Sequence, residues 1–171
     1  LIATTSDDDV RFDLIEILRD EYGNGNREFI HARLLERFLG RLGISKSDVE
    51  AAATIPEVET FTREVARVWS GGNPVKAFGV HFALEMLATR LHESFAKGME
   101  AYPFLSPSDR EYFEYHRKAE QEHADYSERG LLRYAETPEG QRELESGVTE
   151  GINLLTHLYD GLKAYIWPQA A

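Results

Sequence analysis

The feature that most constrains the fold is the spacing of the apolar residues, which follows the period of an α-helix through nearly the whole chain. No segment alternates apolar and polar residues as a half-buried strand does. Glycine, proline and asparagine divide the pattern into segments, and long helices are expected near residues 75–99, 106–134 and 137–167. The sequence therefore predicts an all-α fold, with residues 1–171 forming a single helical domain.

The expected helices begin and end at recognisable signals. Ser45 is followed three residues later by Asp48, which is the pattern of a capping box. Ser106-Pro107 and Thr137-Pro138 each place a hydroxyl before a proline, as the first turn of a helix favours. Gly23-Asn24-Gly25-Asn26 interrupts the first helical stretch, which is expected at residues 8–22.

Charge and composition exclude several classes of function. The chain has 30 acidic and 19 basic residues, so its net charge is −11, whereas nucleic acids and anionic membranes attract cationic surfaces. It has no cysteine, which excludes disulfides, thiolate zinc sites, iron–sulfur clusters and cysteine catalysis. No apolar run approaches the roughly 20 residues of a membrane span. We expect a cytoplasmic protein with no nucleic-acid partner and no membrane partner.

The clearest candidate site is His116-x-x-x-Glu120-x-x-His123. At about 100° per residue, these side chains fall within roughly 60° of one another on one helix face. Two imidazoles and a carboxylate in this arrangement can hold one metal ion or share two. The alternative is an ordinary solvated face, because the surrounding segment is rich in charged residues.

A second group is formed by Glu21, Glu28 and His31. On an unbroken helix these residues would share a face within about 80°. Two glycines lie between Glu21 and Glu28, and each costs about 1 kcal/mol in a helix interior. The segment is therefore either a ligand-bearing helix that melts locally or a helix, a loop and a second helix with ordinary surface acids.

A third element is Glu85, which lies on an apolar helix face. An ionised carboxylate there is costly unless it is paired or bound to a metal. His81 and His92 share this face, four residues before and seven residues after Glu85, so a buried Glu–His pair and a metal bridge are both open. Helical bundles build dinuclear iron or manganese centres from such inward carboxylates and imidazoles. Oxygen and nitrogen ligands without thiolate also suit these two metals, whereas zinc is possible but supplies no redox chemistry.

Three blocks of the sequence, spanning about residues 12–135, resemble the haem-oxygenase-like di-iron oxidase superfamily in residue type, order and spacing. They are Glu21-Tyr-Gly-Asn-Gly-Asn-Arg-Glu28-Phe-Ile-His31, Glu85, and Tyr112-Phe-Glu-Tyr-His116-Arg-Lys-Ala-Glu120-Gln-Glu-His123. The resemblance implies a haem-oxygenase-like (thiaminase-II-like) helical bundle with two irons between its core helices. The ligands that it implies are Glu21, His31, Glu85, His116, Glu120 and His123, with Glu28 as a further carboxylate that some members add.

The chain departs from the family pattern at two points. The third motif usually carries Asp where this chain has Glu120, and the extra methylene requires a shifted helix or a different coordination. Family domains also begin with helices before the first motif, so we expect the domain to lack those N-terminal helices. The resemblance further implies that the first ligand helix is mobile until metal arrives, in keeping with the insert at residues 23–26.

The resemblance implies an O2-dependent non-haem di-iron oxidoreductase. The expected cofactors are two Fe(II)/Fe(III) ions, with Mn as the alternative metal, and the expected partners are O2 and a small-molecule substrate. The expected reaction is N-oxygenation, desaturation or C–C cleavage of an amino acid, an amine or a fatty acid. An external electron donor is kept open, as is a homodimer that would use the apolar edge Tyr165-Ile166-Trp167. No catalytic residue beyond the ligands is assigned.

Two other classes of function compete with this interpretation. The first is a metal-free or haem-binding relative with the same helices. A thiaminase-like hydrolase normally needs a cysteine nucleophile, and a haem site would leave Glu21, Glu85 and Glu120 unexplained. The second is a non-enzymatic helical interaction module, which predicts that the candidate acids and histidines face solvent.

Overall fold

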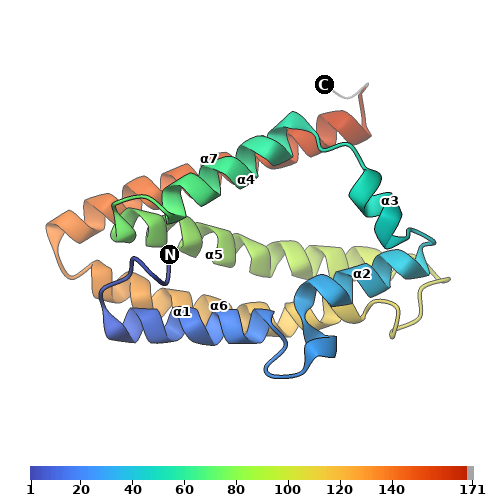
Figure 1. Cartoon of the computed structure of the whole chain (residues 1–171), viewed down its shortest axis with the longest axis horizontal. Coiled ribbons are helices and arrows are strands. Elements are labelled where there is room, and N and C mark those ends of the chain that lie inside the picture. Colours follow the sequence, from blue (N-terminus) through green and yellow to red (C-terminus); the bar gives the residue numbers. More distant parts are fainter. Residues whose placement is uncertain (169–171) are drawn as a thin grey trace. The chain divides into compact units, whose positions relative to one another are not determined.

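The computed structural model describes residues 1–168 and, in that part of the chain, contains only helices and connecting turns (Figure 1). The elements in chain order are α1 (Asp8–Glu21), the 3₁₀ helix η1 (Arg27–Phe29), α2 (His31–Arg41), α3 (Lys46–Ala51), α4 (Pro56–Trp69), α5 (Pro74–Met99), α6 (Glu111–Tyr134) and α7 (Pro138–Ile166). The all-α prediction is confirmed. Within the described residues, none of these helices combines the length and the apolar character that a bilayer span requires.

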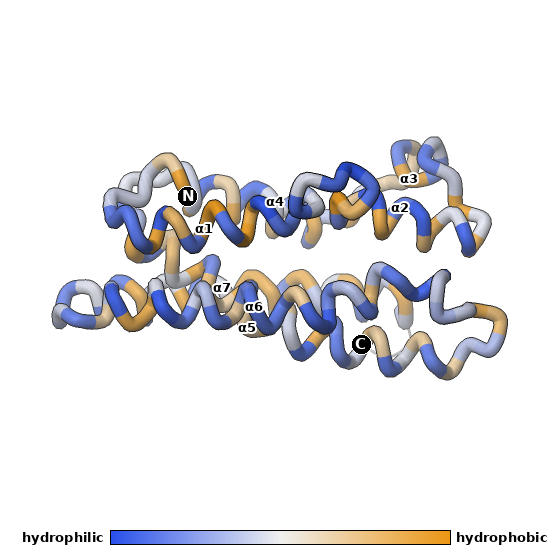
Figure 2. The backbone as a smooth tube through the Cα atoms, turned by 90° about the horizontal axis from the view of Figure 1, so that it is seen from below, coloured by the Kyte–Doolittle hydropathy of each residue, from blue (hydrophilic) through white to orange (hydrophobic). Residues whose placement is uncertain are grey.

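Several predicted helix starts form as expected. Ser45 and Asp48 make the reciprocal bonds of a capping box at the start of α3. Thr137 accepts a hydrogen bond from the Gly140 amide at 3.0 Å, with Pro138 in the first turn of α7. Figure 2 shows polar and apolar residues alternating along the helices at the scale of a turn. This is the pattern from which the helices were predicted.

The predicted start of α6 is wrong by about one turn. Ser106 and Asp109 do form the expected capping bonds, at 3.0 and 3.3 Å. However, the amides of Asp109 and Arg110 bond to carbonyls three residues earlier, which makes tight turns rather than α-helix. The continuous helix therefore begins at Glu111, still ahead of the predicted ligands.

The contacts within the chain define two compact units, each built from separate stretches of sequence. The first contains residues 1–11, residues 53–84 and the chain from Ser127 onward, and the second contains residues 12–52 and 85–126. Helices α1, α5 and α6 each contribute residues to both units. The prediction of a single domain stays a prediction.

The first unit is built on close helix packing. Helix α4 packs against α7, and Val68, Ala77 and Val80 form a buried cluster. Helices α5 and α7 meet at glycines, because a Cβ added at Gly79 would lie 2.6 Å from the Leu144 carbonyl oxygen and 3.0 Å from Gly147 Cα. The backbones at this crossing are too close to admit a larger side chain.

The second unit contains every candidate metal ligand. Its apolar core holds Phe38 and Phe113, whose rings meet edge to face at 4.8 Å. Arg37 pairs with Glu111 at 2.9 Å, and Arg41 pairs with Asp109 at 3.0 Å, so ion pairs join α2 to the start of α6. These contacts hold the ends of the ligand-bearing segments in place.

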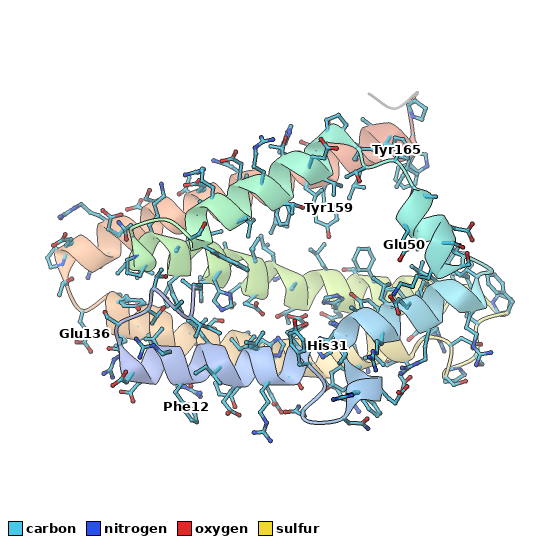
Figure 3. The ribbon with its side chains drawn as sticks, viewed as in Figure 1. Phe12, His31, Glu50, Glu136, Tyr159 and Tyr165 are labelled. Carbon is cyan, nitrogen blue, oxygen red and sulfur yellow. The ribbon has the colours of Figure 1, made fainter. Side chains whose placement is uncertain are left out.

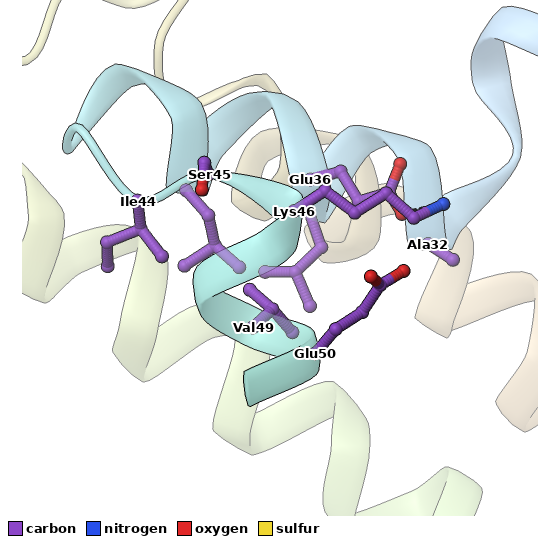
Figure 4. Close-up of a pocket in the computed structure, with 9 residues that line it drawn as sticks. Ala32, Glu36, Ile44, Ser45, Lys46, Val49 and Glu50 are labelled. Atoms are coloured by element: carbon purple, nitrogen blue, oxygen red, sulfur yellow. Dashed lines mark ion pairs between the residues drawn. The ribbon is translucent and has the colours of Figure 1, made fainter. Parts of the chain in front are cut away.

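A groove of about 220 Å³ lies between α2 and α3 in the same unit (Figure 4). Its floor is apolar, with Ile44 and Val49 among the lining residues, and an ion pair of 3.8 Å between Lys46 and Glu36 closes one side. None of the predicted metal ligands lines this groove.

Candidate metal centre

Glu21 and His31, from the second predicted group, are brought together by a turn and not by an unbroken helix. Helix α1 ends at Glu21 and α2 begins at His31 (Figure 3 marks His31). Between them, Gly23, Asn24 and Gly25 have φ angles of +79°, +50° and +86°, a left-handed conformation that glycine adopts easily. This reversal places His31 Nδ1 2.9 Å from Glu21 Oε2.

The clearest candidate of the sequence, His116, Glu120 and His123, lies on one buried face of α6, as its spacing predicts. His116, Glu120 and His123 are only 4%, 4% and 1% exposed. His31, at the start of α2, is also buried. The interaction-module alternative predicts solvent exposure for these groups, so their burial argues against it.

Helix α5 supplies further ligands to the same place. His123 Nδ1 lies 3.5 Å from Glu85 Oε2, and His92 Nδ1 lies 3.1 Å from Glu120 Oε1. Glu85 was in the predicted ligand set, whereas His92 was recognised only as a neighbour of Glu85 on its helix face. The signal for His92 was its spacing of seven residues from Glu85, which a histidine in the core would share.

These side chains form two overlapping groups of ligand atoms. His92, His116 and Glu120 make one group, and Glu85, Glu120 and His123 make the other, with the ligand atoms of each group within 4.8 Å of one another. Glu120 belongs to both groups, so its carboxylate connects them. Two carboxylates and three imidazoles, without thiolate, suit iron or manganese.

Unpartnered buried atoms support a metal at this position. His31 Nδ1 and Nε2, His92 Nδ1, Glu120 Oε2 and His123 Nδ1 are all buried without a hydrogen-bond partner. An unsatisfied buried polar group costs about 1–3 kcal/mol. His31 and His92 lie close to carboxylate oxygens without hydrogen-bond alignment, as ligands of a shared ion do. The residues present therefore fit a bound metal.

His116 is held neutral and in one orientation. Burial lowers the pKa of His116 to about 4, although the Tyr112 carbonyl opposes this shift by accepting a hydrogen bond from Nδ1 at 2.7 Å. With its proton on Nδ1, the ring keeps the lone pair of Nε2 free. Tyr112 also packs its own ring on this imidazole, with 4.2 Å between centroids. His116 is thus ready to bind a metal at neutral pH.

The opposite shift occurs at His123. Burial works to lower the pKa of this ring, but Glu85, Glu120 and Glu21 outweigh it and raise the pKa of His123 to about 9. Without a cation, this acidic cluster is balanced by a proton on the imidazole. A divalent ion supplies the same positive charge and displaces that proton.

Glu28 is not brought into the cluster. It lies on η1, its side chain is 75% exposed, and its carboxylate oxygens lie 3.9 Å from Arg33 and 4.0 Å from Arg37. The turn after α1 removes it from the helix face that it would share with Glu21. Asp20, which was not predicted, lies instead beside the histidines, with Oδ2 3.0 Å from His123 Nε2.

Comparison with known proteins bears on this centre. The model of a protein family described as iron-containing redox enzyme matches residues 1–156. That range includes all of the candidate ligands. No curated protein matches the chain.

Proposed function

The chain belongs to the family of iron-containing redox enzymes and is an oxidoreductase-type iron enzyme with a haem-oxygenase-like helical fold, and from this premise we propose that it is a non-haem di-iron oxidase or oxygenase. Its co-substrate would be O2 and its substrate a small organic molecule. The observation that carries the proposal is Glu120, a buried carboxylate common to two groups of ligand atoms.

The proposed iron ligands come from four helices. His92, His116 and Glu120 would hold one ion, and Glu85, Glu120 and His123 would hold the other. Glu21 lies at the edge of the second group, since Glu21 Oε1 is 3.8 Å from His123 Nδ1. His31 pairs with Glu21 at 2.9 Å, and its ring lies 4.4 Å from that of His116 in the first group. When bound, the irons would supply the electrons that reduce O2, and manganese remains the alternative metal.

The residues around the ligands restrict access of water. The Tyr112 ring lies 4.2 Å from His116 and 5.9 Å from His92, and the Tyr115 ring lies 5.0 Å from His31. These aromatic rings cover the edges of the imidazoles and keep the ligand nitrogens buried. A dry site strengthens electrostatic interactions and protects reactive species from side reactions.

The proposed substrate is an amino acid, an amine or a fatty acid. Glu21, Glu85, Glu120 and the adjacent Asp20 bring four negative charges, and neutral imidazoles bring none, so two divalent ions would be balanced without a charged substrate. N-oxygenation, desaturation and C–C cleavage all remain proposed outcomes, and the use of an external electron donor remains a proposal.

A homodimer is proposed on separate grounds. Tyr165, Ile166 and Trp167 are 70%, 56% and 60% exposed at the end of α7. Exposed aromatic residues of this kind commonly mark contact surfaces.

Iron loading under anaerobic conditions tests the proposed function. The wild-type protein should bind two equivalents of Fe(II), and adding O2 should then give oxygen uptake and a transient visible absorption band. Glu120→Ala should lose both responses, whereas the exposed Glu28→Ala should keep them. Wild-type protein that binds no Fe(II), or that gives a Soret band after haem titration, would contradict the proposal.

A further inference from the structure

A carboxylate outside the predicted ligand set contacts two of the candidate imidazoles. Asp20 lies on the last turn of α1, and its side chain is 16% exposed. Its Oδ2 accepts a hydrogen bond from His123 Nε2 at 3.0 Å and lies 3.7 Å from His31 Nε2. Asp20 is therefore next to the metal-binding cluster and in direct contact with one of its rings.

The other oxygen of Asp20 is held from two sides. Oδ1 accepts a hydrogen bond from the Tyr115 hydroxyl at 2.7 Å and another from the Asn24 side chain. The Tyr115 ring is in turn fixed against His31 and lies 6.1 Å from Phe29. Protein groups thus hold the carboxylate in one orientation.

The two nitrogens of His123 face different groups. Nε2 points to Asp20, whereas Nδ1 is buried without a hydrogen-bond partner and faces Glu85 Oε2 at 3.5 Å. Because the proton on Nε2 is donated to Asp20, the proton that a metal displaces is the one on Nδ1, which leaves the lone pair there. Ligand histidines commonly donate their second N–H to a carboxylate in this way, which fixes the tautomer and the ring orientation.

We propose that Asp20 is a positioning residue that fixes His123 with Nδ1 toward the metal, and that Tyr115 holds Asp20 in place. The inference rests on the proposed function, because it assigns the metal-facing nitrogen of a proposed ligand. His116 is fixed by a backbone carbonyl of its own helix, but His123 depends on a side chain from α1.

Asp20 differs from the proposed ligands in how its oxygens are used. Both of its oxygens accept hydrogen bonds from protein groups. Glu120 Oε2 and His92 Nδ1, by contrast, have no partner and are free for a cation. This difference assigns Asp20 to orienting a ligand and not to binding the ion.

The first test uses the metal-free protein and nuclear magnetic resonance. Wild-type protein should show a slowly exchanging, downfield proton on His123 Nε2, and Asp20→Ala should lose it. Asp20→Asn should restore it in part, because the amide oxygen accepts the same hydrogen bond. Glu16→Ala is the matched control, since Glu16 lies on the same helix and pairs only with Arg19 among the contacts described, at 3.3 Å.

The second test measures Fe(II) affinity and stoichiometry under anaerobic conditions. Asp20→Ala should weaken binding by about 10- to 100-fold, the usual effect of removing a partner of a ligand histidine, while two equivalents still bind. Tyr115→Phe keeps the ring and should give a smaller loss in the same direction. Tyr102→Phe, an exposed tyrosine, is its control and should bind as wild type does.

Each result separates the inference from the proposed function. Asp20→Ala that binds two equivalents as tightly as Glu16→Ala, or that keeps the His123 proton, would overturn the positioning role. Loss of a whole iron equivalent in Asp20→Ala would overturn it in favour of direct ligation. Wild-type protein that binds no Fe(II) would overturn the proposed function, and the inference with it.

Discussion

At the scale of single residues, Glu120 belongs to both groups of ligand atoms, so loss of its charge should weaken metal binding to each group. Glu120→Gln keeps the side-chain volume and removes the negative charge that both groups of ligand atoms share. We expect the variant to retain less than one of two iron equivalents. Metal analysis after anaerobic loading and desalting measures this.

Glu28→Gln is the matched control for that prediction. Glu28 is exposed and lies near two arginines, so its neutralisation should leave iron content at the wild-type level. Equal iron loss in both variants would mean that overall charge, and not the shared carboxylate, governs binding.

The raised pKa of His123 gives a second prediction at this scale. Because its pKa is about 9, the metal-free ring carries a proton at pH 7.5 that Fe(II) must displace. Iron binding should therefore release about one proton at this position. Calorimetric titration in two buffers of different ionisation enthalpy would reveal it as a difference in apparent enthalpy. His123→Gln should abolish the difference, and equal enthalpies for the wild type would contradict the prediction.

Sequence spacing could place some ligands but not others. His116, Glu120 and His123 lie within one continuous helix, where spacing alone fixes the shared face. Glu28 could not be placed, because a turn with left-handed residues redirects the chain after Glu21. Asp20 was missed because its partners lie about a hundred residues away, and no periodic pattern connects them.

At the scale of the helices, replacing glycine by alanine should have opposite effects on stability at two positions, one at the crossing of α5 and α7 and one away from it. Gly147→Ala adds a methyl group where the backbone of α5 is in contact, and overpacking of this kind costs about 1–3 kcal/mol. Gly98→Ala, on the exposed end of α5 with open space around it, should instead stabilise by up to about 1 kcal/mol. Urea unfolding measures both, and destabilisation of equal size would contradict the packing argument.

The turn between α1 and α2 gives a further prediction at this scale. Residues 20–31 contain three left-handed residues and only a short 3₁₀ helix, yet they carry Glu21 and His31. The backbone hydrogen bonds of this turn join residues close in sequence, such as the Asn26 amide and the Gly23 carbonyl, so a metal held by both Glu21 and His31 should protect the segment further. Hydrogen exchange should slow at residues 20–31 when Fe(II) is added and stay constant within α7. Equal protection with and without iron would exclude this coupling.

Helix ends were predictable where a side chain makes the cap. The capping signals at Ser45 and Thr137 are local, and both caps form in the structure. At Ser106 the same signal was read as a helix start, but tight turns follow it and α6 begins at Glu111. A capping pattern predicts a turn, and packing decides whether a helix continues from that turn.

At the scale of the whole molecule, the prediction concerns stability as a function of pH in the metal-free protein. His116 has a folded pKa of about 4, below its usual value of 6.5, so between these values the unfolded chain binds more protons. Stability should therefore rise as the pH increases from 4 to 6.5. His123 has a folded pKa of about 9, so from 6.5 to 9 the folded protein binds more protons and stability should fall.

Together, the two histidines stabilise the folded protein most near pH 6.5. The rise in stability on the acid side and the fall on the alkaline side can be tested separately. His116→Gln should flatten the rise on the acid side, and His123→Gln should flatten the fall on the alkaline side, in urea unfolding at a series of pH values. Saturating Fe(II) should remove the alkaline fall in wild-type protein, because the cation takes the place of the proton on His123. An alkaline limb that is unchanged by His123→Gln would show that the proton balancing the acidic cluster resides elsewhere.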